Sequence, residues 1–325
     1  MRVSVAIGTF NRARMVRGAI EAALEQSLAP FEVVVSDDAS TDQTSAVVQA
    51  LVACDARVKA FRQEANLGVA NHNFAIARTR GDFIAWCSDD DRFMPGHLEA
   101  SLAYLEAHPD IGLVHSGFID SLETRGACEL VPRPLRSLRP IVVHAGNLLA
   151  YMTRYYDWPF HPSTIVMRRE VWERTGGFDP AYALADTDWF VRASERFRIA
   201  LLPRHGVVNR RHAGNWSNRV GSAQMQREIF EIVEKAILRR WPRCGPGRMF
   251  WRAVWRANVR VRLILTLRAR IQGGHVGAAA AAWHVLLQNT GRRTPEWIER
   301  IGCEWIERLG VAGAETAGAT SVSPL

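Results

Sequence analysis

The sequence predicts an α/β protein with a mainly parallel central sheet, followed by a helical region toward the C-terminal end. Strand-length apolar runs alternate with helical patterns five times before about residue 120, which is typical of a parallel sheet with helices on both faces. From about residue 224 to residue 309 the pattern is helical throughout. The residues after 310 are small and polar, so we expect them to form a disordered tail.

The expected elements follow one another in a regular order. In the first half we expect strands at 3–7, 31–35, 58–61, 83–87 and 111–118, and helices at 13–27, 41–53, 69–78 and 95–107. Ser40 or Thr41 would cap the second of these helices, and Gly81 would end the third. In the second half we expect strands at 163–167, 197–202 and 207–208, and helices at 146–155, 168–175 and 185–196.

Three polar clusters lie at the carboxyl ends of expected strands. They are Thr9–Arg12, Asp37–Asp42 and Ser88–Asp91. In an open parallel sheet, ligands bind beyond the carboxyl ends of the strands. The pattern therefore predicts a binding site along this edge of the sheet.

The third cluster contains three consecutive carboxylates, Asp89, Asp90 and Asp91. Like charges this close raise one another's pKa and repel, so the arrangement favours a bound divalent cation. Hard cations such as Mg²⁺ take oxygen ligands and often share one or two carboxylates with substrate phosphates. The alternative is a solvated acidic turn that opens the helix expected at Pro95.

Composition sets broad limits on the class of protein. A chain of 325 residues with 48% apolar and 23% charged residues is ordinary for one or two globular domains. No apolar run approaches the roughly 18 residues of a membrane-spanning helix, and Met1-Arg2 leads into a strand rather than a signal peptide. The five cysteines are scattered, without metal-ligand spacing, so we expect reduced thiols and a cytoplasmic location.

The basic charge is local. The net charge is +8, yet ten arginines and no acid lie between Arg239 and Arg270, so the rest is slightly acidic. This distribution argues against a nucleic-acid-binding protein, although the pI of about 9.8 suggests one. Arginines recur every four residues over 248–263, beside tryptophans. Such a helix suits peripheral contact with an anionic membrane, and docking on the rest of the protein remains an equal alternative.

Five groups of residues, in order along residues 1–220, resemble one known family. They are Ile7–Arg12, Val34–Asp42, Ser88–Asp90, Gly176–Asp179 with Asp186–Trp189, and Arg210–Ser217. Together they resemble the family 2 glycosyltransferases, which have the Rossmann-like GT-A fold. Three departures stand out: Gly8 replaces the usual proline, Ser88 replaces the first acid of the D-x-D motif, and Ala185 replaces a common glutamate. Glycine and proline both suit a tight turn, so we expect the first change to matter little.

The resemblance implies a GT-A catalytic domain over 1–220, with a nucleotide-binding half at 1–120 and an acceptor-binding half at 121–220. A helical region at 221–310 and the tail at 311–325 would follow. The implied activity is inverting transfer of a sugar from a UDP- or dTDP-linked donor to a hydroxyl of a glycan or lipid-linked acceptor. Bacterial polysaccharide, glycolipid or cell-surface glycan synthesis would be the setting.

The resemblance also assigns roles on the donor side. Asp38 would accept a hydrogen bond from a uracil-like base lying against Phe10. The expected nucleotide-binding residues are Thr9, Phe10, Asn11, Arg12, Asp38 and Asp89. Asp90 would hold a cation, Mg²⁺ or Mn²⁺, and Arg211 and His212 would contact the diphosphate. Core packing of Phe10 and helix capping by Asp38 are the structural alternatives.

On the acceptor side, Asp186 would be the catalytic base, with Asp188 helping to raise its pKa. Trp158 and His161 are weaker candidates for the acceptor pocket, and packing between the two halves explains them equally well. Two further alternatives are a module that binds the nucleotide-sugar without catalysis and a nucleotidyltransferase. The latter usually has a glycine-rich basic loop after the first strand, which this sequence lacks.

Overall fold

The computed structural model describes residues 1–124, 127–133, 135, 137–148, 161–216, 220, 222–240 and 249. The predictions for Trp158, for the basic helix at 248–263 apart from residue 249, and for the tail at 311–325 lie outside these residues. The strands are β1 (Val3–Thr9), β2 (Glu32–Asp37), β3 (Val58–Arg62), β4 (Phe83–Trp86), β5 (Arg92–Phe93), β6 (Ile111–Thr124), β7 (Ala127–Pro132), β8 (Ile141–Val143), β9 (Ile165–Arg168) and β10 (Arg198–Arg211). The helices are α1 (Ala13–Leu24), α2 (Thr44–Cys54), α3 (Val69–Ala77), α4 (His97–Ala107), the 3₁₀ helix η1 (Pro162–Thr164), α6 (Arg169–Thr175), α7 (Ala185–Arg196) and α9 (Ser222–Arg240).

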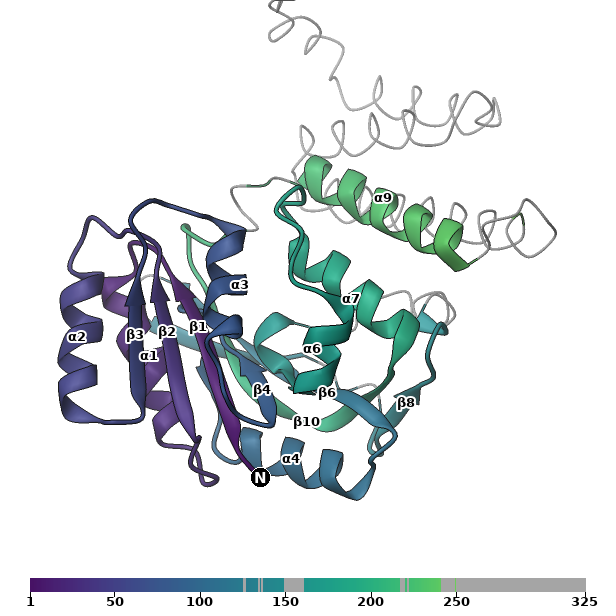
Figure 1. Cartoon of the computed structure of the whole chain (residues 1–325), viewed down its shortest axis with the longest axis horizontal. Helices are drawn as coiled ribbons and strands as arrows, with labels where there is room; N and C mark the ends of the chain where they lie inside the picture. Colours follow the sequence, from purple (N-terminus) through teal and green to yellow (C-terminus); the bar gives the residue numbers. More distant parts are fainter. Residues whose placement is uncertain are drawn as a thin grey trace, which may run out of the picture.

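One sheet runs through the protein in the order β3-β2-β1-β4-β9-β6-β10-β5 (Figure 1). The first four strands in this order are parallel, and β6 and β10 form a second parallel pair. Between these two parts, β9 is antiparallel to both β4 and β6. The predicted α/β class with a mainly parallel sheet is confirmed, and the antiparallel β9 is a feature that the sequence patterns did not predict.

The strand β10 replaces two shorter strands predicted at 197–202 and 207–208. It is continuous for 14 residues and pairs in parallel with β6, although the register shifts on both sides of His205. Pro203 lies next to this irregularity, where a missing backbone N–H is tolerated. The proline therefore bends the strand without ending it, and β10 extends to Arg211.

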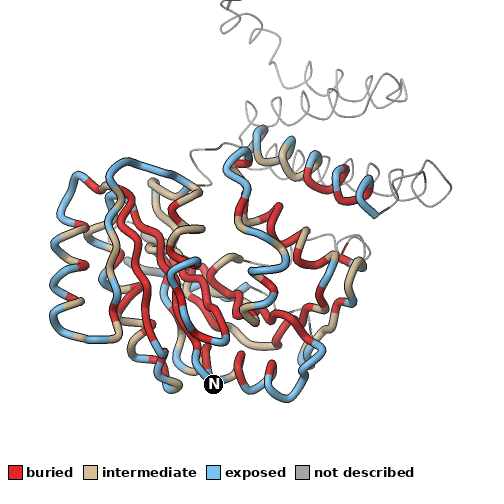
Figure 2. The backbone as a smooth tube through the Cα atoms, viewed as in Figure 1, coloured by how far each residue is buried: buried red, intermediate tan, exposed pale blue. Residues whose placement is uncertain are grey.

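Along β1, the two faces of the sheet differ in the size of their side chains. One face carries large apolar residues under α1, α2 and α4, including Val3, Val5, Ile7, Val33 and Val35. The other face lies under α3, α6 and α7, where β1 contributes the smaller residues Ser4, Ala6 and Gly8. Figure 2 shows the buried strands between these helical layers. Small side chains on β1 let α3 approach the sheet closely.

Two predicted helix boundaries are wrong. Helix α2 begins at Thr44 rather than near Ser40, because the Ser40 hydroxyl is already used: it accepts the backbone N–H of Asn11 at 2.9 Å. Helix α3 ends at Ala77, and Gly81 instead lies against β1, where an added Cβ would be 2.7 Å from the Arg2 carbonyl oxygen. No helix in the described ranges combines the length and hydrophobicity that a membrane crossing requires.

Acid should destabilise the folded protein through two histidines buried in it. Burial lowers the pKa of His97 to about 3 and of His115 to about 4, from 6.5. Both rings stay neutral in the folded protein but become protonated in the unfolded chain. The free energy of unfolding should therefore fall between pH 6.5 and pH 4 by up to about 1.4 kcal/mol per pH unit for each histidine.

Urea unfolding at pH 7, 5.5 and 4.5 measures this dependence. A variant with His97→Gln and His115→Gln should show a shallower slope against pH, whatever its absolute stability. An unchanged slope would show that other groups control acid unfolding.

Candidate active site

The three consecutive acids lie directly after β4, and each has a different environment. Asp89 lies against the Thr9 hydroxyl and the Phe10 backbone N–H, and its Oδ1 is 3.8 Å from Nε of Arg12. Burial, with the charge of Asp90, raises the pKa of Asp89 to about 7. Asp89 therefore belongs to the same cluster as the loop that follows β1.

Asp90 contacts the loop that follows β10. Its Oδ2 lies 3.1 Å from Nε2 of His212 and accepts a hydrogen bond from Nδ2 of Asn215 at 3.3 Å. Nδ1 of His212 accepts the backbone N–H of Gly214 at 3.1 Å, so a neutral His212 carries its proton on Nε2 and donates to Asp90. Arg12 donates to the Gly214 carbonyl oxygen at 2.7 Å. The loop is thus fastened both to Asp90 and to the loop after β1.

Asp91 joins the two parts of the sheet. It is buried, accepts the Ser163 hydroxyl at 2.5 Å and the Arg210 backbone N–H at 3.3 Å, and lies 3.5 Å from Nδ1 of His161. The sequence left open that Asp91 caps the following helix, but α4 begins at His97 with Gly96 as its N-cap. Asp91 instead anchors the segment that carries His161.

Asp186 lies in the first turn of α7, and burial raises the pKa of its carboxyl above 3.8. His161 lies near enough for the charges of Asp90 and Asp186 both to act on it, although burial keeps its pKa lowered to about 4. The carboxylates of Asp90 and Asp186, almost a hundred residues apart in the sequence, are therefore both near enough to one imidazole to act on it.

Most of the residues that the resemblance assigns to nucleotide binding lie at the carboxyl ends of β1 and β2. Phe10 is 39% exposed, so it is not a core residue. Asp38 is buried; its Oδ1 accepts the Leu67 backbone N–H at 2.7 Å and its Oδ2 accepts that of Gly68 at 2.9 Å. Each carboxylate oxygen can accept a second hydrogen bond, so Asp38 retains capacity for a ligand N–H.

Asn11 has a clear local role. Its φ of 52° is in the left-handed region, which asparagine tolerates better than most residues. Its Oδ1 accepts the Thr41 backbone N–H at 2.8 Å. Asn11 therefore holds the loops after β1 and β2 together, and Thr9 joins them as its carbonyl oxygen accepts the Asp38 backbone N–H at 2.8 Å.

Two predicted site residues have other partners. Nε of Arg211 donates to Asp120 at 3.1 Å, and Asp120 also pairs with Arg133, so Arg211 does not lie with His212 on Asp90. Asp188 is buried and forms an ion pair with Arg192 at 2.7 Å. Burial, and not Asp188, raises the pKa of Asp186, which corrects the role expected for Asp188.

The structure adds His72 of α3, which the sequence patterns did not single out. Burial lowers the pKa of His72 to about 4, although the negative charge of Asp90 acts to raise it. Its Nδ1 is buried without a hydrogen-bond partner among the described residues, and its ring packs edge-on against Trp86 with centroids 5.3 Å apart. The one sign of this contact in the sequence was Gly8. This glycine lies within β1 opposite Ser36 rather than in a turn. A Cβ on residue 8 would be 2.6 Å from Nδ1 of His72.

Gly8→Ala should lower the free energy of unfolding by about 1–3 kcal/mol, because the added methyl group forces His72 away from β1. Gly8→Ala combined with His72→Ala should recover part of that loss, since the clashing ring is gone. Thermal or urea unfolding measures both. Gly18→Ala is a matched control in α1, because its nearest neighbour is the exposed, movable Arg92 side chain. Equal losses for both glycines would contradict the proposed contact.

The acids after β4 fit a cation that is shared with a ligand. Asp89 and Asp90 are adjacent, partly exposed carboxylates, and burial together with the charge of Asp90 has raised the pKa of Asp89. Within the described ranges, no three His, Cys, Asp or Glu side chains are grouped as a complete protein metal site. Mg²⁺ and related ions commonly take only one or two carboxylates from the protein and the rest from phosphates and water.

The mainly parallel sheet, with a cluster of acids beyond the carboxyl end of β4, has the architecture of the GT-A fold. The sequence profile described as "Glycosyl transferase family 2" matches residues 4–174, just over half of the chain. The protein belongs to this family and is a glycosyltransferase.

Relatives of known name agree with this assignment. The chain is 31% identical to the glycosyltransferase EpsE of Bacillus subtilis over 181 residues, 54% of this chain and 60% of EpsE. It is 36% identical over 99 residues to the Campylobacter jejuni GalNAc(5)-diNAcBac-PP-undecaprenol beta-1,3-glucosyltransferase, 30% of this chain and 32% of that one.

Two solved structures share the fold. The Staphylococcus aureus TarS fragment 1–349 with UDP-GlcNAc has a TM-score of 0.60 at 21% identity, covering 73% of this chain and 67% of that fragment. The mannosyltransferase PcManGT of Pyrobaculum calidifontis, in complex with GDP-Man and Mn²⁺, has a TM-score of 0.56 at 18% identity, covering 97% and 81% of the two chains. At these identities the likeness establishes the fold.

Proposed function

We propose that this enzyme transfers a sugar from a UDP- or dTDP-linked donor to an acceptor hydroxyl, with inversion at the anomeric carbon. The observation that carries the proposal is that Asp90, after β4, and Asp186, in the first turn of α7, lie close enough to His161 for the charges of both to act on it. An inverting transferase needs leaving-group stabilisation on one face of the sugar and a base on the other. This pair of carboxylates supplies one residue for each task.

On the donor side, Phe10 offers an exposed aromatic face at the carboxyl end of β1 for the base to lie against. Asp38 would accept the ring N–H, and Asp89 would lie near the ribose. Thr9, Asn11 and Arg12 shape the same loop. His212, which is already directed at Asp90, would donate from Nε2 to the diphosphate once the donor is in place.

On the acceptor side, Asp186 would remove the hydroxyl proton as the acceptor oxygen attacks the anomeric carbon. A new C–O bond forms to the acceptor while the glycosidic C–O bond breaks, and the nucleoside diphosphate leaves with the bonding electrons. The raised pKa of Asp186 makes it a stronger base than an ordinary aspartate at neutral pH. His161, on which the charges of this carboxylate and of Asp90 both act, would help to orient the reacting groups.

A divalent cation, Mg²⁺ or Mn²⁺, would be held by Asp90, with Asp89 close by. When bound, it would neutralise charge that develops on the diphosphate. The Mn²⁺ complex of the similarly folded mannosyltransferase supports this part of the proposal.

The acceptor would be a glycan or a lipid-linked saccharide of bacterial polysaccharide, glycolipid or cell-surface glycan synthesis. The similarity to the Campylobacter undecaprenol-linked glucosyltransferase supports this class of acceptor. We place the enzyme in the cytoplasm, with peripheral membrane contact through the arginine-rich segment 248–263.

A donor screen tests the proposal. Purified enzyme should release nucleoside diphosphate slowly from one nucleotide-sugar, with water as the acceptor, when Mg²⁺ or Mn²⁺ is present. UDP- and dTDP-linked sugars are the first candidates, and GDP-linked sugars are the comparison set. No release from any donor with either metal would count against an active transferase.

A further inference from the structure

The three residues before the base-bearing helix are fixed from outside that helix. They are Tyr182, Ala183 and Leu184, which lead directly into α7. Leu184 is the N-cap of α7 and makes no side-chain capping hydrogen bond. The first N–H groups of a helix lack partners within it, and leucine supplies no acceptor.

Helix α9 supplies the missing acceptor. Oε2 of Glu228 accepts the Leu184 backbone N–H at 2.8 Å, across 44 residues of sequence. Nε2 of Gln224, one turn earlier on α9, donates to Oε1 of Glu228 at 2.9 Å and holds the carboxylate in that orientation. A negative group at a helix N-terminus is also favoured by the helix dipole. Glu228 thus caps α7 two residues before Asp186.

Two further contacts hold the same segment. Nζ of Lys235, also on α9, donates to the Tyr182 hydroxyl, and Nε1 of Trp216 donates to the Ala183 carbonyl oxygen at 2.9 Å. Trp216 follows His212 and Asn215, which contact Asp90. The turn before Asp186 is therefore held by α9 on one side and by the Asp90 loop on the other.

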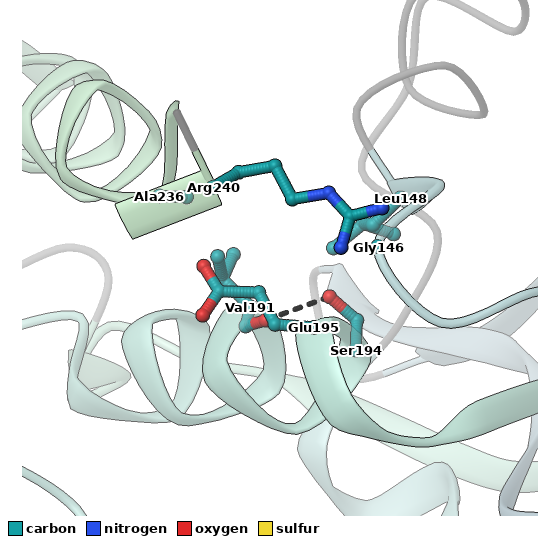
Figure 3. Close-up of a pocket in the computed structure, with 7 residues that line it drawn as sticks. All are labelled: Gly146, Leu148, Val191, Ser194, Glu195, Ala236 and Arg240. Atoms are coloured by element: carbon teal, nitrogen blue, oxygen red, sulfur yellow. Dashed lines mark hydrogen bonds between the residues drawn. The ribbon is translucent and has the colours of Figure 1, made fainter. Parts of the chain in front are cut away.

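Packing between α7 and α9 lets Glu228 hold a fixed position. Ile232, Val233, Ala236 and Ile237 of α9 are buried in the same core as Trp189, Phe190 and Ala193 of α7. Figure 3 shows the far end of this interface, where Ala236 and Arg240 lie over Val191 and Ser194 beside a small cavity. Arg239 pairs there with Glu195 at 2.9 Å. The contact at each end makes α9 a fixed support for α7.

We propose that Glu228 is a positioning residue for Asp186, so that α9 belongs to the active site although it lies outside the family match at 4–174. The inference rests on the proposed role of Asp186 as base. Capping by Glu228 fixes the first turn of α7, and the first turn fixes where the Asp186 carboxylate meets the acceptor oxygen. A displacement of about 1 Å at a reacting group costs up to about 100-fold in rate.

The test compares Glu228→Ala with Glu228→Gln in the donor-hydrolysis assay. Glu228→Ala should lower kcat about 10- to 100-fold and leave the KM for the donor within about twofold, since the donor contacts are untouched. Glu228→Gln should recover most of the rate, because the amide oxygen can accept the Leu184 N–H. Arg227→Ala is the matched control, as Arg227 is an exposed residue of α9 next to Glu228 in the sequence.

A double-mutant cycle separates positioning from general damage. If Glu228 acts through Asp186, Glu228→Ala should cause no further loss in an Asp186→Asn background. Losses that multiply, a Glu228→Ala enzyme as fast as wild type, or an equal loss for Arg227→Ala would each overturn the inference. A wild-type enzyme without turnover would overturn the proposed function itself, which is a different result.

Discussion

Asp186→Asn should lower kcat by about 10²- to 10⁴-fold while the donor still binds. The amide has nearly the same shape as the carboxylate but cannot accept the acceptor proton. Donor binding depends on residues after β1, β2 and β4, so the Kd for the nucleotide-sugar should stay within about threefold of wild type. Transfer or donor hydrolysis gives kcat, and isothermal titration calorimetry gives Kd.

The pH dependence provides a second readout for Asp186. Burial raises its pKa above the ordinary 3.8, so kcat should fall on the acid side as the base becomes protonated. That acid limb should be absent from the residual activity of Asp186→Asn. Asp179→Asn is the control, because Asp179 is an exposed acid of the same segment that accepts only the Ala181 backbone N–H among the described contacts. Wild-type activity in Asp186→Asn would require another base.

Asp90→Asn should lower kcat by at least about 100-fold and weaken donor binding in the presence of Mn²⁺. Loss of the charged ligand removes several kcal/mol of transition-state stabilisation, and each 1.36 kcal/mol is about tenfold in rate. Chelation of metal should likewise abolish turnover by the wild-type enzyme, with recovery when Mg²⁺ or Mn²⁺ is added back. Turnover assays and Mn²⁺ titration with bound donor measure both effects.

Asp82→Asn is the matched control for Asp90. Asp82 precedes the other end of β4, is exposed, and pairs with Arg2 at 3.5 Å. This variant should keep full activity and the same Mn²⁺ dependence. Full activity of Asp90→Asn in the presence of a chelator would contradict the role of Asp90 in holding a cation.

The first half of the fold could be predicted because its signals are local. Each of β1 to β4 is a short apolar run followed by a turn, and the helices between them have a clear apolar face. The second half could not be predicted in the same way. The direction of β9 depends on its partners β4 and β6, and the length of β10 depends on partners that offset the break at Pro203. Neither the direction of β9 nor the length of β10 can be predicted from a few consecutive residues.

The candidate site shows the same division. Residues within motifs, such as Asp89, Asp90, Asp186 and His212, could be proposed from the sequence because residue type and position both carry information. His72 was missed because a single histidine in a helix resembles any polar surface residue. Its burial depends on Gly8, whose missing side chain makes room for the ring. Arg211 is the last residue of β10 and pairs with Asp120, whereas His212 begins the loop that contacts Asp90, a difference that their neighbouring positions in the sequence do not reveal.

The position of β6 between β9 and β10 limits how this enzyme can be recombined with its relatives. A chimera with residues 121–220 from another transferase would have to rebuild the β4–β9, β6–β9, β6–β10 and β5–β10 pairings at once. Residues 121–220 therefore cannot be replaced by the matching segment of a relative unless the new segment restores all four strand pairings.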